Sequence, residues 1–172
     1  NGYESITGQI NTEFVKFNKN LENSVNLFAD FNGRYEANIV STSKLNEKWG
    51  QSILLHGNAT VGEMDDNHDT FLDRPKGNQI NAAYLLDYND LENSGFGSHF
   101  GIQYLVDKRI AGQVGFDGKL PQISQNKYGV NIDINRFQVW NKTGYIFKGK
   151  PYQSIGLMNQ FTYHKQNSFF GL

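Results

Sequence analysis

The 172-residue sequence contains no cysteine, only 3 prolines and no long run of apolar residues. The absence of cysteine excludes disulfides, thiolate catalysis and cysteine-based metal sites, but it does not fix the compartment. Without a run of about 18 apolar residues, a transmembrane helix is excluded. The mean hydropathy of −0.58 would also be too polar for a helical membrane protein. It is compatible with membrane-spanning β-strands, because only every second residue of such a strand faces lipid.

Charge of either sign is not in surplus. The 16 Lys and Arg residues nearly balance the 17 Asp and Glu residues, for a net charge of −1. This balance gives no indication of a nucleic-acid partner, and no block of like charge indicates a tail. Aromatic residues are abundant, at 14% of the chain. The sequence opens on Asn1-Gly2-Tyr3 without a signal peptide, so we expect either a mature chain or a part of a longer one.

Apolar and polar residues alternate along seven segments of the chain. These segments lie approximately at residues 25–31, 34–39, 49–61, 79–88, 96–107, 136–147 and 154–163. A period of two predicts β-strands with one apolar face. Several segments reach about 10 residues, which a tilted strand needs to cross a bilayer, whereas strands of soluble proteins typically have about 5 or 6. The alternation is imperfect, because four large apolar residues fall on polar faces: Leu54, Leu85, Leu105 and Trp140.

The predicted connections alternate between short and long. Asn32-Gly33 indicates a tight hairpin. The later connections are expected at residues 46–48, 62–78, 90–95, 108–130 and 148–151. Outer-membrane barrels show this alternation because short periplasmic turns lie at one end and longer external loops at the other. Aromatic residues also gather near the predicted strand ends, as in interfacial girdles, although aromatics favour strands in general.

The predicted fold class is therefore all-β: an antiparallel transmembrane β-barrel, here a partial barrel of about seven strands. Single-chain bacterial barrels have even strand counts from 8 upward, and an unclosed sheet would leave two bare edges. We therefore expect a part of a larger barrel, with the missing strands mainly after Leu172. Residues 169–172 are interpreted as the start of another outer loop rather than as an aromatic barrel C-terminus.

Residues 2–14, which include Gly8-Gln9-Ile10-Asn11, resemble the end of the plug domain of TonB-dependent outer-membrane receptors. In that family a Gly-x-Ile-Asn stretch precedes the first barrel strand. Residues 31–38, 64–75 and 142–157 resemble the early barrel of the same family. The resemblance covers nearly the whole chain. It implies that residues 1–18 are the C-terminal end of the plug and residues 19–172 the N-terminal part of the transmembrane β-barrel.

The resemblance also implies a 22-stranded barrel in the bacterial outer membrane, surrounded by outer-membrane lipid and closed by an internal plug. Its function would be TonB-dependent uptake of a scarce nutrient such as a siderophore, corrinoid, haem or glycan. TonB would bind through an N-terminal part that lies outside this sequence, and a surface lipoprotein is a further implied partner. The connections at 46–48, 90–95 and 148–151 would face the periplasm, and the long loops would face outward.

The acidic segment 65–73 is the strongest local motif. Its oxygen ligands fall at positions 1, 3, 5, 7 and 9 of an EF-hand-type loop, where position 7 offers its main-chain carbonyl: Asp65, Asn67, Asp69, Phe71 and Asp73. Calcium binds several oxygens on such a loop, so a Ca²⁺ site is predicted. Thr70 replaces the usual glycine, Lys76 replaces the bidentate acid, and no flanking helices are predicted. A solvated acidic loop closed by Arg74-Pro75 is the alternative.

No catalytic motif is present, so we expect no enzyme. The four histidines lack metal-ligand spacing, and three of them, His56, His99 and His164, fall on polar faces that would line a lumen. Further candidates for lumen-lining residues are Arg34, Glu36, Asn38, Asn58, Gln79, Asn81, Gln103 and Arg136. Two other functions remain open at this point. One is a soluble, calcium-stabilised all-β module for ligands such as glycans, and the other is a barrel-embedded enzyme, for which no catalytic set is found.

Overall fold

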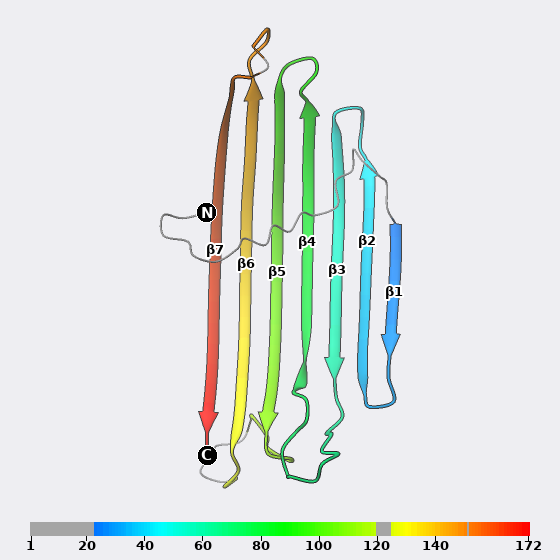
Figure 1. The fold of residues 1–172 in the computed structure, drawn as a ribbon, viewed down its shortest axis with the longest axis vertical. Helices are drawn as coiled ribbons and strands as arrows, with labels where there is room; N and C mark the ends of the chain where they lie inside the picture. Colours follow the sequence, from blue (N-terminus) through cyan, green and yellow to red (C-terminus); the bar gives the residue numbers. More distant parts are fainter. Residues whose placement is uncertain (1–22, 120–124, 151) are drawn as a thin grey trace.

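The computed structural model describes residues 23–119, 125–150 and 152–172. These residues form a single antiparallel sheet in which every strand pairs with its neighbours in the sequence (Figure 1). The strands are β1 (Asn23–Ala29), β2 (Arg34–Lys44), β3 (Trp49–Thr60), β4 (Lys76–Asp90), β5 (Phe96–Gly112), β6 (Gly129–Ile146) and β7 (Ser154–Gly171). No helix that could span a membrane occurs in this described part of the chain. The prediction of an all-β, seven-stranded antiparallel fold is confirmed.

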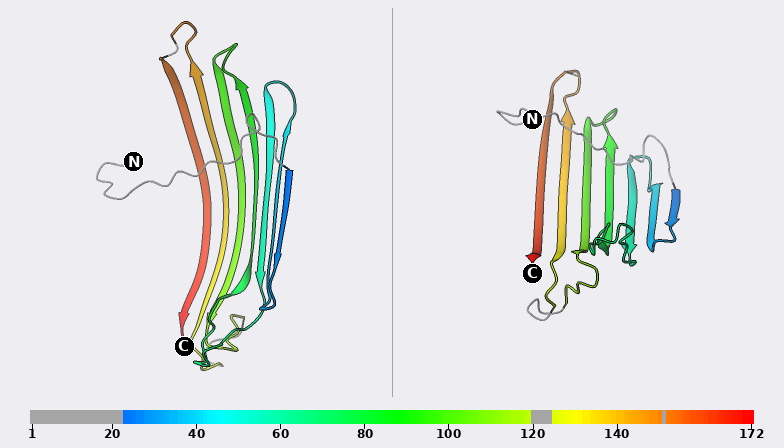
Figure 2. Two further views of the ribbon diagram at one scale, coloured as in Figure 1. Left: turned by 45° about the vertical axis from the view of Figure 1, so that its right-hand side comes forward. Right: turned by 60° about the horizontal axis from the view of Figure 1, so that its bottom comes forward.

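The sheet is open. Its strand order runs linearly from β1 to β7, and these two strands form its edges. The longest strands bow along their length, so that the sheet is curved rather than flat (Figure 2). Strand length rises across the sheet from 7 residues in β1 to 18 in β6 and β7. The expected part of the plug, residues 1–18, lies outside the described residues.

The connections separate the two ends of the sheet. At the short-turn end lie residues 45–48, 91–95 and 147–153, and at the long-loop end lie residues 30–33, 61–75 and 113–128. The predicted alternation of short and long connections is therefore confirmed. The hairpin at Asn32-Gly33 is also confirmed, because Gly33 has a left-handed φ of 77° and its N–H donates to the Asp30 carbonyl over 3.2 Å.

Two predicted boundaries at the long-loop end are wrong. β5 continues to Gly112 and β6 begins at Gly129, so the predicted loop 108–130 shortens to 113–128. Residues 169–171 belong to β7 and pair with β6, so they do not begin an outer loop. The physical reason is that backbone pairing continues where the side-chain pattern changes: in this region Ile132 and Ile134 lie on the opposite face from Val139.

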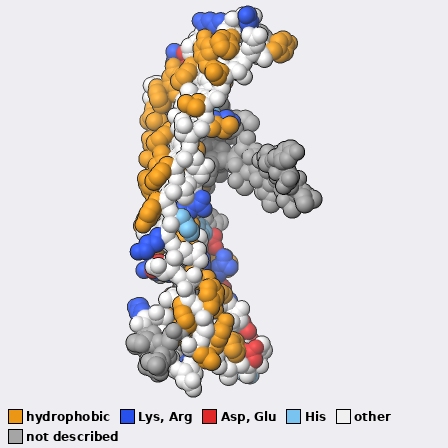
Figure 3. Space-filling view, turned by 90° about the vertical axis from the view of Figure 1, so that its left-hand side faces the viewer, with side chains coloured by type: hydrophobic (Ala, Val, Ile, Leu, Met, Phe, Trp, Pro, Cys, Tyr) orange, Lys and Arg blue, Asp and Glu red, His pale blue; other side chains and the backbone are white. Residues whose placement is uncertain are grey.

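The register gives the sheet two chemically different faces. The apolar face carries the large apolar side chains that the sequence placed together: Val25, Leu27, Tyr35, Ile39, Trp49, Ile53, Leu55, Ile80, Tyr84, Leu86, Tyr88, Phe100, Ile102, Tyr104, Val106, Phe137, Val139, Tyr145, Ile155, Leu157, Phe161 and Tyr163. The other side is called the polar face. Figure 3 views the sheet from its β7 edge and shows hydrophobic side chains along one side, with charged groups and histidine beyond them.

The sheet has almost no hydrophobic core. Among the described residues, the buried hydrophobic side chains are Ala83, Leu85 and Phe116. In contrast, apolar side chains such as Leu27 and Phe161 are 75% and 62% exposed. Contiguous exposed apolar surface on this scale marks a membrane, partner or ligand surface rather than an ordinary soluble exterior.

Candidate functional site

The polar face contains a continuous hydrogen-bonded network across β2, β3, β4 and β5. Its members alternate along each strand and meet across the register: Arg34, Glu36, Asn38, His56, Asn58, Gln79, Asp107 and Arg109. Along β2, the Arg34 guanidinium donates to Glu36 over 3.0 Å, and the Asn38 amide donates to Glu36 over 3.1 Å. We call these eight residues the polar network.

Asn58 is the centre of the polar network. Its Nδ2 donates to Gln79 over 2.8 Å and approaches His56 Nε2 at 2.9 Å, while its Oδ1 accepts from Arg109 over 3.4 Å. His56 Nδ1 in turn hydrogen-bonds Asn38. A neutral imidazole with its proton on Nδ1 satisfies both contacts, because Nδ1 then donates to Asn38 and Nε2 accepts from Asn58.

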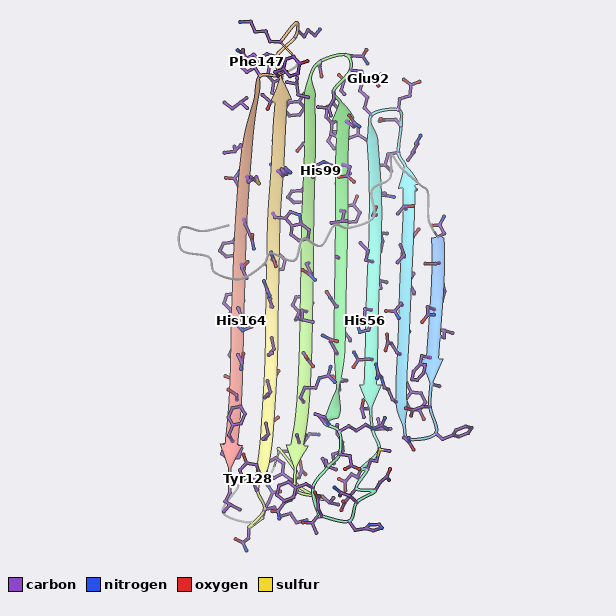
Figure 4. All side chains as sticks on the ribbon, in the orientation of Figure 1. His56, Glu92, His99, Tyr128, Phe147 and His164 are labelled. Atoms are coloured by element: carbon purple, nitrogen blue, oxygen red, sulfur yellow. The ribbon has the colours of Figure 1, made fainter. Side chains whose placement is uncertain are left out.

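Two further hydrogen bonds lie on the polar face, outside the polar network. Gln103 donates to Asn81 over 2.9 Å, and Arg136 donates to Gln138 over 3.1 Å. His164 lies opposite Arg136 in the register. Figure 4 shows His56 and His164 at the same height on β3 and β7, whereas His99 lies nearer the short-turn end, where it contacts Asp87.

An ion pair and a hydrogen bond link the first hairpin to the long loop 61–75. The Arg74 guanidinium donates to the Asp30 carboxylate over 3.2 Å and also to the Asn32 carbonyl. Asp30 accepts the Arg34 N–H over 2.9 Å. Lys76 pairs with Glu63 at the base of the same loop. A groove of about 460 Å³ opens between the hairpin and the loop, lined in part by Phe31, Asn32 and Met64.

These contacts shift the acidities of the groups at both ends of the sheet. The Arg34 N–H, together with the Arg74 guanidinium, holds the pKa of Asp30 below its usual value. The Lys76 ammonium lowers the pKa of Glu63 in the same way. At the short-turn end, Asp90 raises the pKa of Lys48 by accepting its hydrogen bond over 3.1 Å. Each shift favours the charged form of the group.

The acidic loop is closed by its own carboxylates. Asp65 accepts the N–H groups of Asp69 and Thr70, each over 3.0 Å. Asn67 accepts the Asp69 N–H over 3.2 Å, and Asp69 accepts the Phe71 N–H over 2.8 Å. Thr70, at the position where the motif usually has glycine, has a left-handed φ of 72°. The turn is therefore compact.

The structure places the five predicted calcium ligands on this one loop. The fifth member of the set, Asp73, accepts the Asp66 N–H over 2.8 Å. Among the described residues, no group of three or more His, Asp or Glu side chains is arranged as a metal site. Calcium binding stays a prediction.

The two long loops are joined to each other by backbone hydrogen bonds. Leu72 N–H donates to the Gly112 carbonyl over 2.8 Å, and Val114 N–H donates to the Thr70 carbonyl over 2.9 Å. The rings of Phe71 and Tyr128 lie with centroids 6.3 Å apart. The acidic loop is thereby fixed to the base of loop 113–128, a contact that no local sequence pattern indicates.

The structure brings together six of the lumen candidates proposed from sequence. These members of the polar network are Arg34, Glu36, Asn38, His56, Asn58 and Gln79. The candidates Asn81 and Gln103 bond to each other, and Arg136 lies apart on β6.

Two members of the network were not among the candidates, namely Asp107 and Arg109. Asp107 is the last residue of the predicted strand 96–107, and Arg109 continues the alternation of β5 beyond that predicted end.

The chain matches no family model, no curated protein and no solved structure.

Proposed function

We propose that this chain is part of the transmembrane β-barrel of a bacterial outer-membrane receptor that takes up a scarce nutrient. The observation that carries the proposal is the apolar face. It is exposed on every strand, whereas the reverse face is polar and hydrogen-bonded across β2 to β5. A single-layer sheet with these two faces is stable only if lipid, or a second apolar layer, covers the apolar one.

The width of the apolar face fits a bilayer. On β5 it runs from Phe96 to Val106, and Lys108 follows on the same face. These ten residue steps correspond to about 33 Å along the strand at about 3.3 Å per residue. If the strand is tilted by about 35–45°, the band is roughly 25 Å tall, which is the height of the apolar band of outer-membrane barrels.

The outer boundary of the apolar face supports such a tilt. On β3 the apolar residues end at Ala59, and pairing across β4, β5 and β6 sets Asn167 of β7 level with it. On β7, however, the last residue of the apolar run is Tyr163, four residues nearer the short-turn end. A displacement of about 13 Å over four strand spacings of about 4.8 Å gives an angle of about 35°.

The polar face would line the lumen, and the long loops would face outward. The polar network then lies near the mouth, where a nutrient would enter. TonB dependence, the plug and a surface lipoprotein rest on the resemblance of residues 2–14 and of the barrel segments. The soluble all-β module is less well supported, because strands of 15–18 residues exceed the usual length of about 5 or 6 in soluble sheets.

Single cysteines placed on adjacent residues of the full-length protein test this topology. The segment itself has no cysteine, so Ile102→Cys and Gln103→Cys each add one thiol to it. After fluorescent labelling in proteoliposomes, we expect a nitroxide lipid to quench the label at position 102 and aqueous iodide to quench the label at position 103. Equal iodide quenching at both positions, or recovery of the parent protein as a soluble monomer without detergent, would overturn the proposal.

We propose in addition that Ca²⁺ binds the acidic loop through Asp65, Asn67, Asp69, Asp73 and the Phe71 carbonyl. Binding would order the loop near the ligand entrance, since oxygen ligands on one tight turn favour a hard cation. Hydrogen exchange of residues 61–75 should slow in calcium relative to chelator, and Asp69→Ala should abolish that difference. The matched control is Asp117→Ala in the other long loop. Identical protection with and without calcium would reject the site.

A further inference from the structure

β6 and β7 differ in charge from the other strands of the polar face. On β2 and β5, each arginine is paired with a carboxylate two residues away: Arg34 with Glu36 at 3.0 Å, and Arg109 with Asp107 at 2.6 Å. The polar face of β6 and β7, two strands that the structure describes throughout, carries Arg136, Lys142 and His164 and no acidic residue. The one acidic residue of these strands, Asp133, lies opposite Lys108 in the register, on the apolar face.

Arg136 is the central group of this basic region. Its side chain is exposed, and within the described part of the chain it forms a hydrogen bond to Gln138 but no ion pair. His164 lies directly opposite it on β7, and Thr162 lies opposite Gln138. A guanidinium beside an imidazole, an amide and a hydroxyl offers convergent donors for a carboxylate or a phosphate. The two other arginines of the polar face have carboxylate partners of their own.

Apolar side chains border this group beside it on β5 and toward the long loops along β6. Leu105 lies opposite Arg136 on β5. Ile134 and Ile132 follow Arg136 along the same face of β6, and Val130 pairs with Phe170 beyond them. On β6 this part of the polar face is apolar. Its register partners are charged on β5, Asp107 and Arg109, and polar on β7, Gln166 and Ser168. The anion-binding group is thus continuous with a narrow apolar strip on β6.

We infer that Arg136 and His164 form a binding subsite for the carboxylate or phosphate group of an amphipathic ligand. The apolar part of that ligand lies along Leu105, Ile134 and Ile132. Arg136 is the anchor, since a guanidinium holds an oxyanion through two parallel hydrogen bonds. The inference rests on the proposed function, because it requires the polar face to line a lumen that a ligand can enter.

Three small probes test the inference on the full-length receptor in lipid nanodiscs. Benzoate joins a carboxylate to an apolar ring, benzyl alcohol has the ring without the charge, and inorganic phosphate has charge without the ring. We expect benzoate to bind more tightly than either of the others. Arg136→Gln should weaken benzoate binding by about tenfold or more, as expected for loss of a charge-assisted hydrogen bond, and His164→Gln should weaken it less.

Lys165→Gln is the matched control. It removes the same charge from the neighbouring residue of β7, but Lys165 lies on the opposite face, where it pairs with Asn135. Benzoate binding should be unchanged in this variant. Equal losses in Arg136→Gln and Lys165→Gln, or binding of benzyl alcohol or phosphate as tight as that of benzoate, would overturn the inference.

Failure of the subsite can be distinguished from failure of the proposed function. The quenching pattern at positions 102 and 103 is measured on the two cysteine variants in the same kind of lipid nanodisc. If that pattern alternates and benzoate does not bind, the subsite is wrong while the barrel stands. If it does not alternate, the proposed function is wrong and the subsite falls with it.

Discussion

The apolar and polar faces of the sheet are built from the same strands but are stabilised in different ways. On the apolar face, Ile102 is flanked in the register by Tyr84 and Val139. The one polar group of these three side chains is the Tyr84 hydroxyl, which donates to Gln51. On the polar face, the single side chain of Asn58 forms hydrogen bonds to residues on two other strands. The stability of the apolar face therefore depends on the apolar surroundings that cover it, and the stability of the polar face depends on specific hydrogen bonds.

Reversing the polarity of the apolar face should have the largest effect. Ile102→Arg places a charge near the middle of the apolar band, which costs about 2–4 kcal/mol in an outer-membrane barrel. Gln103→Arg places the same charge on the polar face and should cost much less. Urea unfolding of both variants of the full-length protein in lipid vesicles measures the difference. Equal destabilisation would mean that the two faces meet the same solvent.

Gly101 tests packing on the polar face. A methyl group at this position would lie 2.2 Å from the ring of Trp140, its register partner on β6. Gly101→Ala should therefore destabilise the protein by about 1–3 kcal/mol, as overpacking does. Gly156→Ala is the control, because the nearest atom to its new methyl, the Thr143 carbonyl oxygen, is at 3.8 Å. If both variants unfold at the same urea concentration, the ring has an alternative position.

The polar network should make a smaller contribution. Asn58→Ala removes the contacts to His56, Gln79 and Arg109. Because water in a lumen can replace part of these bonds, the expected loss is about 1 kcal/mol. Asn26→Ala, on the polar face of β1, has no hydrogen bond to lose among those of the described residues and serves as control. A loss in Asn58→Ala no larger than in Asn26→Ala would contradict the central role of Asn58.

The smallest effect is expected from a fall in pH, which acts on carboxylates at the long-loop end. The pKa values of Asp30 and Glu63 are lowered in the folded protein, so both groups stabilise it above their ordinary pKa. That contribution decreases as the pH falls through the lowered values, when the carboxylates lose their charge. A spin label at the exposed position 31 should therefore become more mobile at low pH. Asp30→Asn should be mobile already at neutral pH, and a pH-independent spectrum in the wild type would refute the link.

The sequence was sufficient for the strands and faces in the middle of the sheet. In β3, Ile53, Leu55 and His56 lie on the faces that their alternation predicts. Large apolar residues on the polar face, such as Trp140, were visible as exceptions but not explained. Their explanation is non-local: Trp140 occupies space over Gly101, which lies 39 positions earlier in the chain and across a strand boundary.

The ends of β5, β6 and β7 at the long loops could not be predicted from the alternation of apolar and polar residues, because the apolar residues change face there. Ile132 and Ile134 continue a regular strand on the polar face, and only pairing with β5 and β7 shows that the strand persists. The same applies to Arg109, which was assigned to a loop and belongs to the polar network.

The sequence by itself determined the seven strands, the hairpin at Asn32-Gly33 and the alternation of connections. All of these depend on residues a few positions apart, whose backbone preferences and side-chain directions are local. Only the tertiary structure decided that Arg109 meets Asn58, that Arg74 meets Asp30, and that Arg136 lies opposite His164. Those contacts depend on the register accumulated over successive strands, and a single-residue slip would send each side chain to the opposite face.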